Sequence, residues 1–223
     1  MNEPTTMTKT IRTRPKIKKR RKNEYSLLSD TQIKNHLELG SVVIDPYIPE
    51  NLNNSSYDVT LGPYYFRENR DYPLPGNIYN VYDESHVRHV WQGPLKAAPV
   101  KEIQGKYHIE LENISPLDEV ILLKPQETIL AHTNEYIGGT HGIINTMMKA
   151  RSSLGRNFIE VCKCAGWGDV GYINRWTMEI TNNSRHYTIP LVVGRRVAQI
   201  VFFETGDILE KDYAASGKYQ TAQ

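Results

Sequence analysis

The sequence lacks the features that mark membrane-bound or disulfide-rich proteins. Its 223 residues contain no run of the about eighteen apolar residues that a membrane-spanning helix needs. Its polar, basic start has no apolar segment of the kind found in secretory signals. The two cysteines, Cys162 and Cys164, are one residue apart, so a disulfide between them would be badly strained. We therefore expect an intracellular, cytoplasmic protein in a reducing compartment.

Acidic residues are missing from the start of the chain after its third residue. Between residues 9 and 22 there are nine Lys or Arg side chains and no Asp or Glu, although the whole chain has a formal net charge of only +2. Such a run cannot bury itself, so residues 1–23 are expected to form a basic, disordered tail ahead of an acidic body. The tail is interpreted as a nuclear localisation signal, a nucleic-acid contact or a plain solubility tail.

Helical periodicity is scarce and is concentrated in one short segment near residue 30. Ser29 and Gln32 have the spacing of a capping box, and Gly40 follows a short apolar face, so a helix is predicted between them. Residues 42–44 and 57–61 are then predicted to be short strands.

Strand patterns with Gly or Pro between them fill most of the remaining chain. Strands are predicted at 120–123, 128–132, 143–149, 158–164, 174–182, 187–193 and 196–203. This spacing predicts an all-β barrel or jelly roll with one or two short helices. The domain is expected to cover 24–223, with hairpins or a loosely patterned insertion near 64–113.

A Walker A motif is absent, but a short basic loop is suited to phosphate groups. Arg151 and Arg156 flank Ser152, Ser153, Leu154 and Gly155. The planar guanidinium matches phosphate oxygens, the hydroxyls add donors, and the glycine allows close approach of the backbone. A solvated basic turn is an equally good interpretation of this loop alone.

A glycine-rich turn with one carboxylate and two aromatic residues follows at 165–172. Aromatic side chains beside closely approaching backbone could hold a base or a sugar. Taken without its context, the segment is read more readily as a hairpin turn whose aromatic residues belong to the core.

Glu179 lies in a strand that otherwise has one apolar face. Trp176, Met178 and Ile180 share that face, so Glu179 lies on the opposite face with Arg175. A glutamate of raised pKa in a cleft is a natural general base for activating water. The alternative is a surface glutamate paired with Arg175.

Together, and in this order, the segments resemble the dCTP deaminase family of the dCTP deaminase and dUTPase superfamily. The R-S-S-L-x-R loop is followed by an A-G-W-x-D-x-G-Y stretch and a T-x-E strand. Further matching segments are 28–62, 123–138, 194–203 and 217–220, so about three quarters of the chain is included. Ala150, Val170 and Asn174 depart from the usual family residues, and Gln223 is displaced from the family's final glutamine or replaces it.

The resemblance implies a distorted jelly-roll β-barrel that forms a homotrimer. Its active sites would lie between subunits, and the arm 214–223 would close over the nucleotide. Glu179 would be the general base for attack of water on C4 of cytosine, and Ala165, Ser152 and Arg156 would position that water and the intermediate. Mg²⁺ would accompany the triphosphate, with no metal held by protein side chains.

The remaining family positions fall on residues that would contact the nucleotide. Those for the triphosphate are Arg151, Ser153, Gln199, Tyr213 and Lys218, and those against the deoxyribose are Asp169 and Tyr172. The expected nucleotide-binding set is completed by Leu154, Gly155, Gly166, Thr177, Met178 and Gln223.

Cysteine spacing excludes zinc chemistry for such a reaction. Zinc-dependent deaminases use an H-x-E element and a P-C-x-x-C element, whereas the cysteines here form a C-x-C pair, predicted on one face of a strand. We interpret both cysteines as core or edge residues.

The expected activity is deamination of dCTP to dUTP and ammonia. A bifunctional enzyme that continues to dUMP and diphosphate is held nearly level, because Ala165 and Gly166 resemble the turn of bifunctional members. A plain dUTPase and a non-catalytic binder of nucleotide or nucleic acid are the alternatives.

Overall fold

The computed structural model describes residues 26–140, 143–206 and 208. The helix predicted from the capping box is confirmed as α1 (Asp30–Glu38): Ser29 is its N-cap, and both hydrogen bonds of the box with Gln32 are present. Gly40 lies just beyond its end with a φ of 71°. In this part of the chain, no helix is long and apolar enough to cross a membrane.

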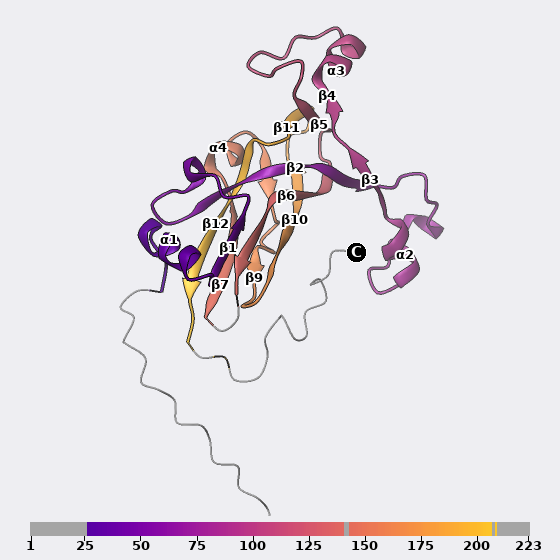
Figure 1. Ribbon diagram of the computed structural model, residues 1–223. Helices are drawn as coiled ribbons and strands as arrows, with labels where there is room; N and C mark the ends of the chain where they lie inside the picture. The colour runs from indigo at the N-terminus through magenta and orange to yellow at the C-terminus, as the bar shows by residue number, and fades with distance from the viewer. Residues whose placement is uncertain (1–25, 141–142, 207, 209–223) are drawn as a thin grey trace, which may run out of the picture.

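Two sheets make up the body. The larger has the order β8-β10-β6-β2-β12-β7-β9, with β1 on β6 and β3 on β2, and the smaller has the order β11-β5-β4. The strands are β1 (Val42–Asp45), β2 (Tyr57–Glu68), β3 (Trp91–Lys96), β4 (Ala98–Pro99), β5 (Glu119–Leu123), β6 (Thr128–Gly139), β7 (Ile144–Ala150), β8 (Ile159–Val161), β9 (Trp167–Gly168), β10 (Ile173–Asn182), β11 (Ile189–Val192) and β12 (Arg196–Glu204). Every pairing with a known register is antiparallel, and Figure 1 shows the large sheet curling around the core.

The main core lies inside this curled sheet. Alternate residues of β2, β6, β10 and β12 point into it, as period-two alternation requires. Its fully buried members include Tyr57, Ile129, Met178, Ile180 and Phe202.

The chain between β2 and β5 extends away from the barrel (Figure 1) and contains α2 (Glu84–His89) and α3 (Val100–Tyr107). These helices were not predicted from the sequence. α2 has six residues, too few for a helical period to be visible, and its start is capped by Asp83, whose Oδ1 accepts a hydrogen bond from Ser85 N. A small separate core around Val100, Ile103 and Val192 fixes α3 against the smaller sheet.

The strand predicted at 158–164 is shorter than expected, and the expectation that both cysteines share one strand face is wrong. β8 ends at Val161, and Cys162, Lys163 and Cys164 all have positive φ values of 66°, 36° and 68°. This left-handed run turns the chain, so Cys162 is buried while Cys164 is exposed.

Candidate functional site

Glu179 lies on the outer face of the large sheet, as the alternation predicted. Trp176, Met178 and Ile180 point into the core, while the Glu179 side chain is half-buried. Glu179 is opposite Leu130 of β6, which is opposite Phe66 of β2. Directly opposed residues of antiparallel strands project from the same face, so Glu179 sits at the end of an apolar row that reaches solvent.

Arg175 does not neutralise Glu179. Its guanidinium lies over the ring of Tyr136, 5.1 Å from the centroid. Across the part of the chain that the structure describes, no ion pair or hydrogen bond joins Arg175 or any other cation to the Glu179 carboxylate. The carboxylate is thus available to a water molecule or a ligand.

Cys162 is hydrogen-bonded to the backbone of Glu179 and has a buried thiol. Its backbone N–H donates to the Glu179 carbonyl over 2.9 Å, and its thiol lies 3.0 Å from the sulfur of Met148. Burial, with a smaller contribution from the Glu179 carboxylate, raises the pKa of Cys162 to about 12. The group is therefore a neutral thiol of the core near pH 7, not a thiolate ligand or nucleophile.

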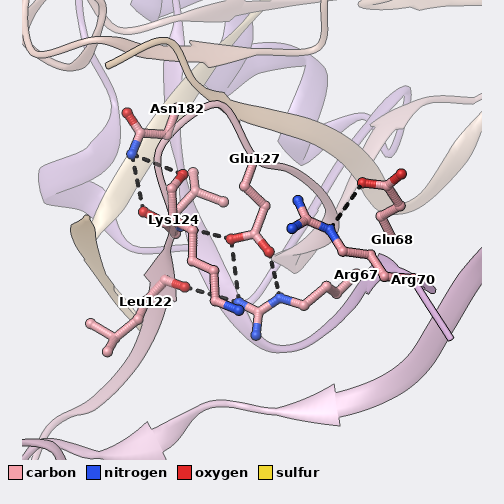
Figure 2. Close-up of polar contacts among 8 residues, drawn as sticks. Arg67, Glu68, Arg70, Leu122, Lys124, Glu127 and Asn182 are labelled. Atoms are coloured by element: carbon pink, nitrogen blue, oxygen red, sulfur yellow. Dashed lines mark hydrogen bonds and ion pairs between the residues drawn. The ribbon is translucent and has the colours of Figure 1, made fainter. Parts of the chain in front are cut away.

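A polar network fixes the end of β10 three residues beyond Glu179 (Figure 2). The Asn182 backbone N–H donates to the Glu127 carbonyl, and its side-chain amide donates to the Lys124 carbonyl at 3.1 Å. The buried Glu127 carboxylate accepts from Lys124 N at 2.7 Å and pairs with Arg67 Nε at 2.6 Å. These bonds join β2 and β10 to the turn between β5 and β6 and so hold the strand that carries Glu179 in register.

The glycine-rich turn at 165–172 lies beside β7, where close approach of two backbones excludes larger residues. Met148 N donates to the Gly166 carbonyl over 2.7 Å, and a Cβ at Gly166 would overlap the Met148 carbonyl. A Cβ at Gly168 would meet both the Thr146 hydroxyl and the Trp176 ring. The turn is therefore pressed against the sheet behind it.

The side chains of this turn differ in exposure. Trp167 and Asp169 are both exposed, so the Trp167 ring forms no part of the core. Tyr172 is half-buried, with its ring edge-on to Trp176 at 5.1 Å between centroids, and its N–H donates to the Asp169 carbonyl. The turn is packed rigidly against the sheet, and it presents the Asp169 carboxylate and the Tyr172 ring to a ligand.

The basic loop begins after β7 with a short helix, α4 (Ser152–Gly155), which packs against β8, the neighbour of β10. Ser152, Ser153 and Arg156 are exposed, and Leu154 packs against the core. Within the described residues no hydrogen bond links Ser152 or Arg156 to Glu179. One chain therefore supplies both the basic loop and Glu179, but no hydrogen bond connects the two.

The other predicted site residues fall into two groups. Thr177 is exposed on the face of Glu179, Met178 points into the core, and Gln199 is half-buried on β12. Tyr213, Lys218 and Gln223, with the arm 214–223 and the tail 1–23, lie outside the described residues. Within the described part of the chain, no group of three or more His, Cys, Asp or Glu side chains is placed to hold a metal ion.

Comparison with known proteins identifies the family. The model of the dCTP deaminase-like family matches residues 27–205. The chain belongs to the dCTP deaminase-like family. The suggested family resemblance is therefore confirmed.

Curated relatives in the dCTP deaminase-like family match along most of their length. A protein of Methanopyrus kandleri named "dCTP deaminase, dUMP-forming" is 32% identical over 87% of this chain and 90% of its own. A protein of Acidothermus cellulolyticus with the same name is 31% identical over 85% of each chain.

A solved structure of the family shares the fold. The 2'-deoxycytidine 5'-triphosphate deaminase of Agrobacterium tumefaciens superposes with a TM-score of 0.54 at 16% identity, over 85% of this chain. The chain spans 51% of the length of that protein. The predicted β-rich fold with few helices is confirmed by this likeness and by the strand content described above.

Two buried carboxylates of this dCTP deaminase-like chain were missed by the sequence analysis. Asp58, on β2, is 2% exposed and lies 3.4 Å from Arg151 Nη2 and 3.5 Å from Arg196 Nη1. Glu135, on β6, is fully buried and accepts hydrogen bonds from the N–H and hydroxyl of Thr60. An acid within a largely apolar predicted strand is the signal that could have identified Asp58, whereas Glu135 follows His132, Thr133 and Asn134 and has no such signal.

Proposed function

We propose that the protein hydrolyses dCTP to dUMP, releasing ammonia from the base and diphosphate from the triphosphate. Several curated relatives carry the name "dCTP deaminase, dUMP-forming", which favours this product over the dUTP expected first from sequence. The Ala165-Gly166 turn supports the same choice. The reduced cysteines Cys162 and Cys164 suit a cytoplasmic enzyme.

The observation that carries the proposal is the unpaired, half-buried carboxylate of Glu179 on a strand fixed at its far end. As general base, Glu179 takes a proton from water, and the hydroxide adds to C4 of cytosine. Glu179 returns its proton to N3 as C4 becomes tetrahedral. The proton of the new C4 hydroxyl then passes through Glu179 to the amino nitrogen, the bond from C4 to that nitrogen breaks, and ammonia leaves as the C4 carbonyl of uracil forms. Ser152, Arg156 and the Ala165 backbone are assigned to the water and to the developing charge, where fixed donors have their largest effect.

The phosphate and sugar positions follow from the same assignment. Arg151, Ser153 and Gln199, with Tyr213 and Lys218, are proposed to bind the triphosphate, and Asp169 and Tyr172 to lie against the deoxyribose. Guanidinium and hydroxyl donors fit phosphate oxygens. Mg²⁺ is proposed to enter with the triphosphate, as part of the substrate, and to neutralise some of its charge.

A second copy of the chain is proposed to complete the site. The outer face that carries Glu179 also carries Phe66, 37% exposed, Tyr64, 48% exposed, and Tyr136, 39% exposed. Neighbouring exposed aromatic side chains are typical of a surface that a partner covers. A homotrimer would bring the basic loop of one subunit to the Glu179 face of the next. It would also shield the cytosine ring and the attacking water from bulk solvent.

The test is to incubate the protein with dCTP and Mg²⁺ and to separate the nucleotides by anion exchange. We expect dUMP and diphosphate. Accumulating dUTP would restrict the activity to deamination, and unchanged dCTP would contradict the proposal.

Glu179→Gln tests the assigned base. The substitution is nearly isosteric and removes only the proton acceptor, so ammonia release is expected to fall about 10²- to 10⁴-fold while dCTP binding is retained. The matched control is Glu119→Gln. Glu119 lies on β5 of the smaller sheet and pairs with Lys96 of β3, so this variant is expected to leave turnover unchanged. Ammonia release at the wild-type rate in Glu179→Gln would exclude Glu179 as the base.

A further inference from the structure

A β-bulge brings Arg196 onto the same face of the sheet as Gln199. β12 pairs with β2 so that Gln199 is opposite Asp58 and Arg196 is opposite Thr60, with the register shifting between Arg196 and Ala198. Asp58 and Thr60 are two residues apart and share one face. The extra residue of the bulge therefore lets Arg196 and Gln199, three residues apart, project from that face together.

The side chains on this face surround one buried carboxylate. Asp58 pairs with Arg151 and with Arg196, at 3.4 and 3.5 Å, and Arg151 Nη1 also lies 3.5 Å from the Arg196 carbonyl. Glu135 holds Thr60, the residue opposite Arg196, through two hydrogen bonds of 3.0 and 2.8 Å. The strand behind the two arginines is thus tied to β6 and does not adjust freely.

The ion pairs of Asp58 do not balance in charge. One carboxylate faces two guanidinium groups, which leaves one positive charge in excess. The side chain of Asp58 is 3% exposed, whereas those of Arg151 and Arg196 are 28% and 45% exposed. The excess positive charge therefore faces solvent, and an anion with several oxygens is the ligand that both forks can bind at once.

We propose that Arg196 is a second arginine for the triphosphate and that Asp58 is the positioning residue that orients both Arg151 and Arg196. The inference rests on the proposed function in one respect, that Arg151 and Gln199 face the triphosphate. Asp58 touches no substrate atom and acts through the two guanidinium groups.

The neighbouring Arg195 provides a matched control. Its guanidinium pairs with Asp118 at 3.7 Å and donates to the Asn113 carbonyl, on the extension before β5. Arg195→Gln and Arg196→Gln remove the same charge from adjacent positions, so they change the net charge of the protein equally. A difference in binding between the two variants therefore reports the position of the arginine and not the net charge of the protein.

The first measurement is calorimetric binding of inorganic tripolyphosphate with Mg²⁺ to the full-length chain. Arg196→Gln is expected to weaken binding about ten- to hundredfold, and Arg195→Gln by less than about twofold. Arg196→Lys keeps the charge but not the fork and is expected to recover part of the loss. Wild-type affinity in Arg196→Gln, or an equal loss in Arg195→Gln, would overturn the assignment.

The second measurement separates positioning from general support of the fold. With dCTP as substrate, Asp58→Asn and Arg196→Gln are each expected to raise KM, with kcat within about threefold of wild type. The double variant is expected to be little worse than the worse single one, because residues of one network are not additive. Additive losses, or a fall in kcat with KM unchanged, would exclude Asp58 as a positioning residue.

Failure of the inference is distinguishable from failure of the proposed function. Tripolyphosphate binding is measured without turnover, whereas the proposed function is measured by dUMP formation in the wild type. A protein that binds tripolyphosphate through Arg196 and leaves dCTP intact would contradict the activity alone.

Discussion

At the scale of single residues, His132 links the site face to the fold. Its Nδ1 lies 2.8 Å from the Thr133 carbonyl, and Tyr64 N donates to its Nε2 over 3.3 Å. It is opposite Thr177, two residues from Glu179. Burial lowers the pKa of His132, and the nearby charge of Arg175 acts in the same direction, although the bond to Thr133 opposes them. The folded protein therefore favours the neutral ring, with Nε2 as acceptor.

This shift predicts a loss of stability in acid. Because the pKa of His132 is lower in the folded than in the unfolded chain, the unfolded chain takes up the proton first as the pH falls below about 6.5. The stabilisation is complete above that pH and declines as the pH falls through the folded pKa. Urea unfolding at about pH 7.5 and about pH 5 should show a larger decrease in wild type than in His132→Gln. Equal decreases would show that His132 does not titrate differently in the two states.

The residue scale is also where sequence reasoning succeeded and failed most clearly. Glu179 could be placed on the outer face of the sheet because strand alternation separates it from Trp176 and Met178. Arg196 could not, because its face depends on a bulge, and one extra residue in a strand reverses the alternation beyond it. The pairing of Asp58 with Arg151 joins residues far apart in sequence, which local patterns do not predict.

At the scale of elements, the position of the turn depends on the contact between β9 and β7. Gly168→Ala would place a methyl group against Thr146 and Trp176, and overpacking of this kind typically costs about 1–3 kcal/mol. We expect that loss in the free energy of unfolding, with weaker dCTP binding because Asp169 is displaced.

The control for Gly168 is Gly105→Ala in α3, where a Cβ meets no atom within 4 Å. Alanine favours a helix interior over glycine by about 1 kcal/mol, so this variant should be as stable as wild type or more stable. Chemical denaturation of both variants gives the comparison. A Gly168→Ala protein of wild-type stability would show that the two backbones can separate at no cost.

Elements with strong local signals were predicted, and elements fixed by distant contacts were not. The capping box of α1 and the apolar alternation of β10 are encoded in neighbouring residues. β8 was predicted too long because Cys162, Lys163 and Cys164 continue an alternation of apolar and polar residues. In the structure all three have φ values in the left-handed region and turn the chain toward β9. β2 continues to Glu68, beyond the predicted 57–61, because β3 and β6 supply pairing partners.

At the scale of the whole molecule, the spacing of strands was enough to predict a curled β fold but not its strand order. The neighbours β2 and β12 are separated by most of the chain, so their pairing follows from closing the core and not from any local pattern. The same limit applies to assembly, because a face that a second copy would cover differs from a solvent-facing one only after the strands are arranged.

The proposed trimer predicts that a charge in the apolar row beside Glu179 will disrupt both assembly and activity. Phe66 is 37% exposed in one chain, and a lysine there would be desolvated between subunits without a partner, which is costly. Light scattering should give three chain masses for wild type and a smaller assembly for Phe66→Lys, with loss of dCTP turnover. Tyr82→Lys changes a 95% exposed aromatic residue on the extension and should leave both unchanged. A trimeric and active Phe66→Lys would place the subunit interface elsewhere, and an active monomer would show that one chain holds the complete site.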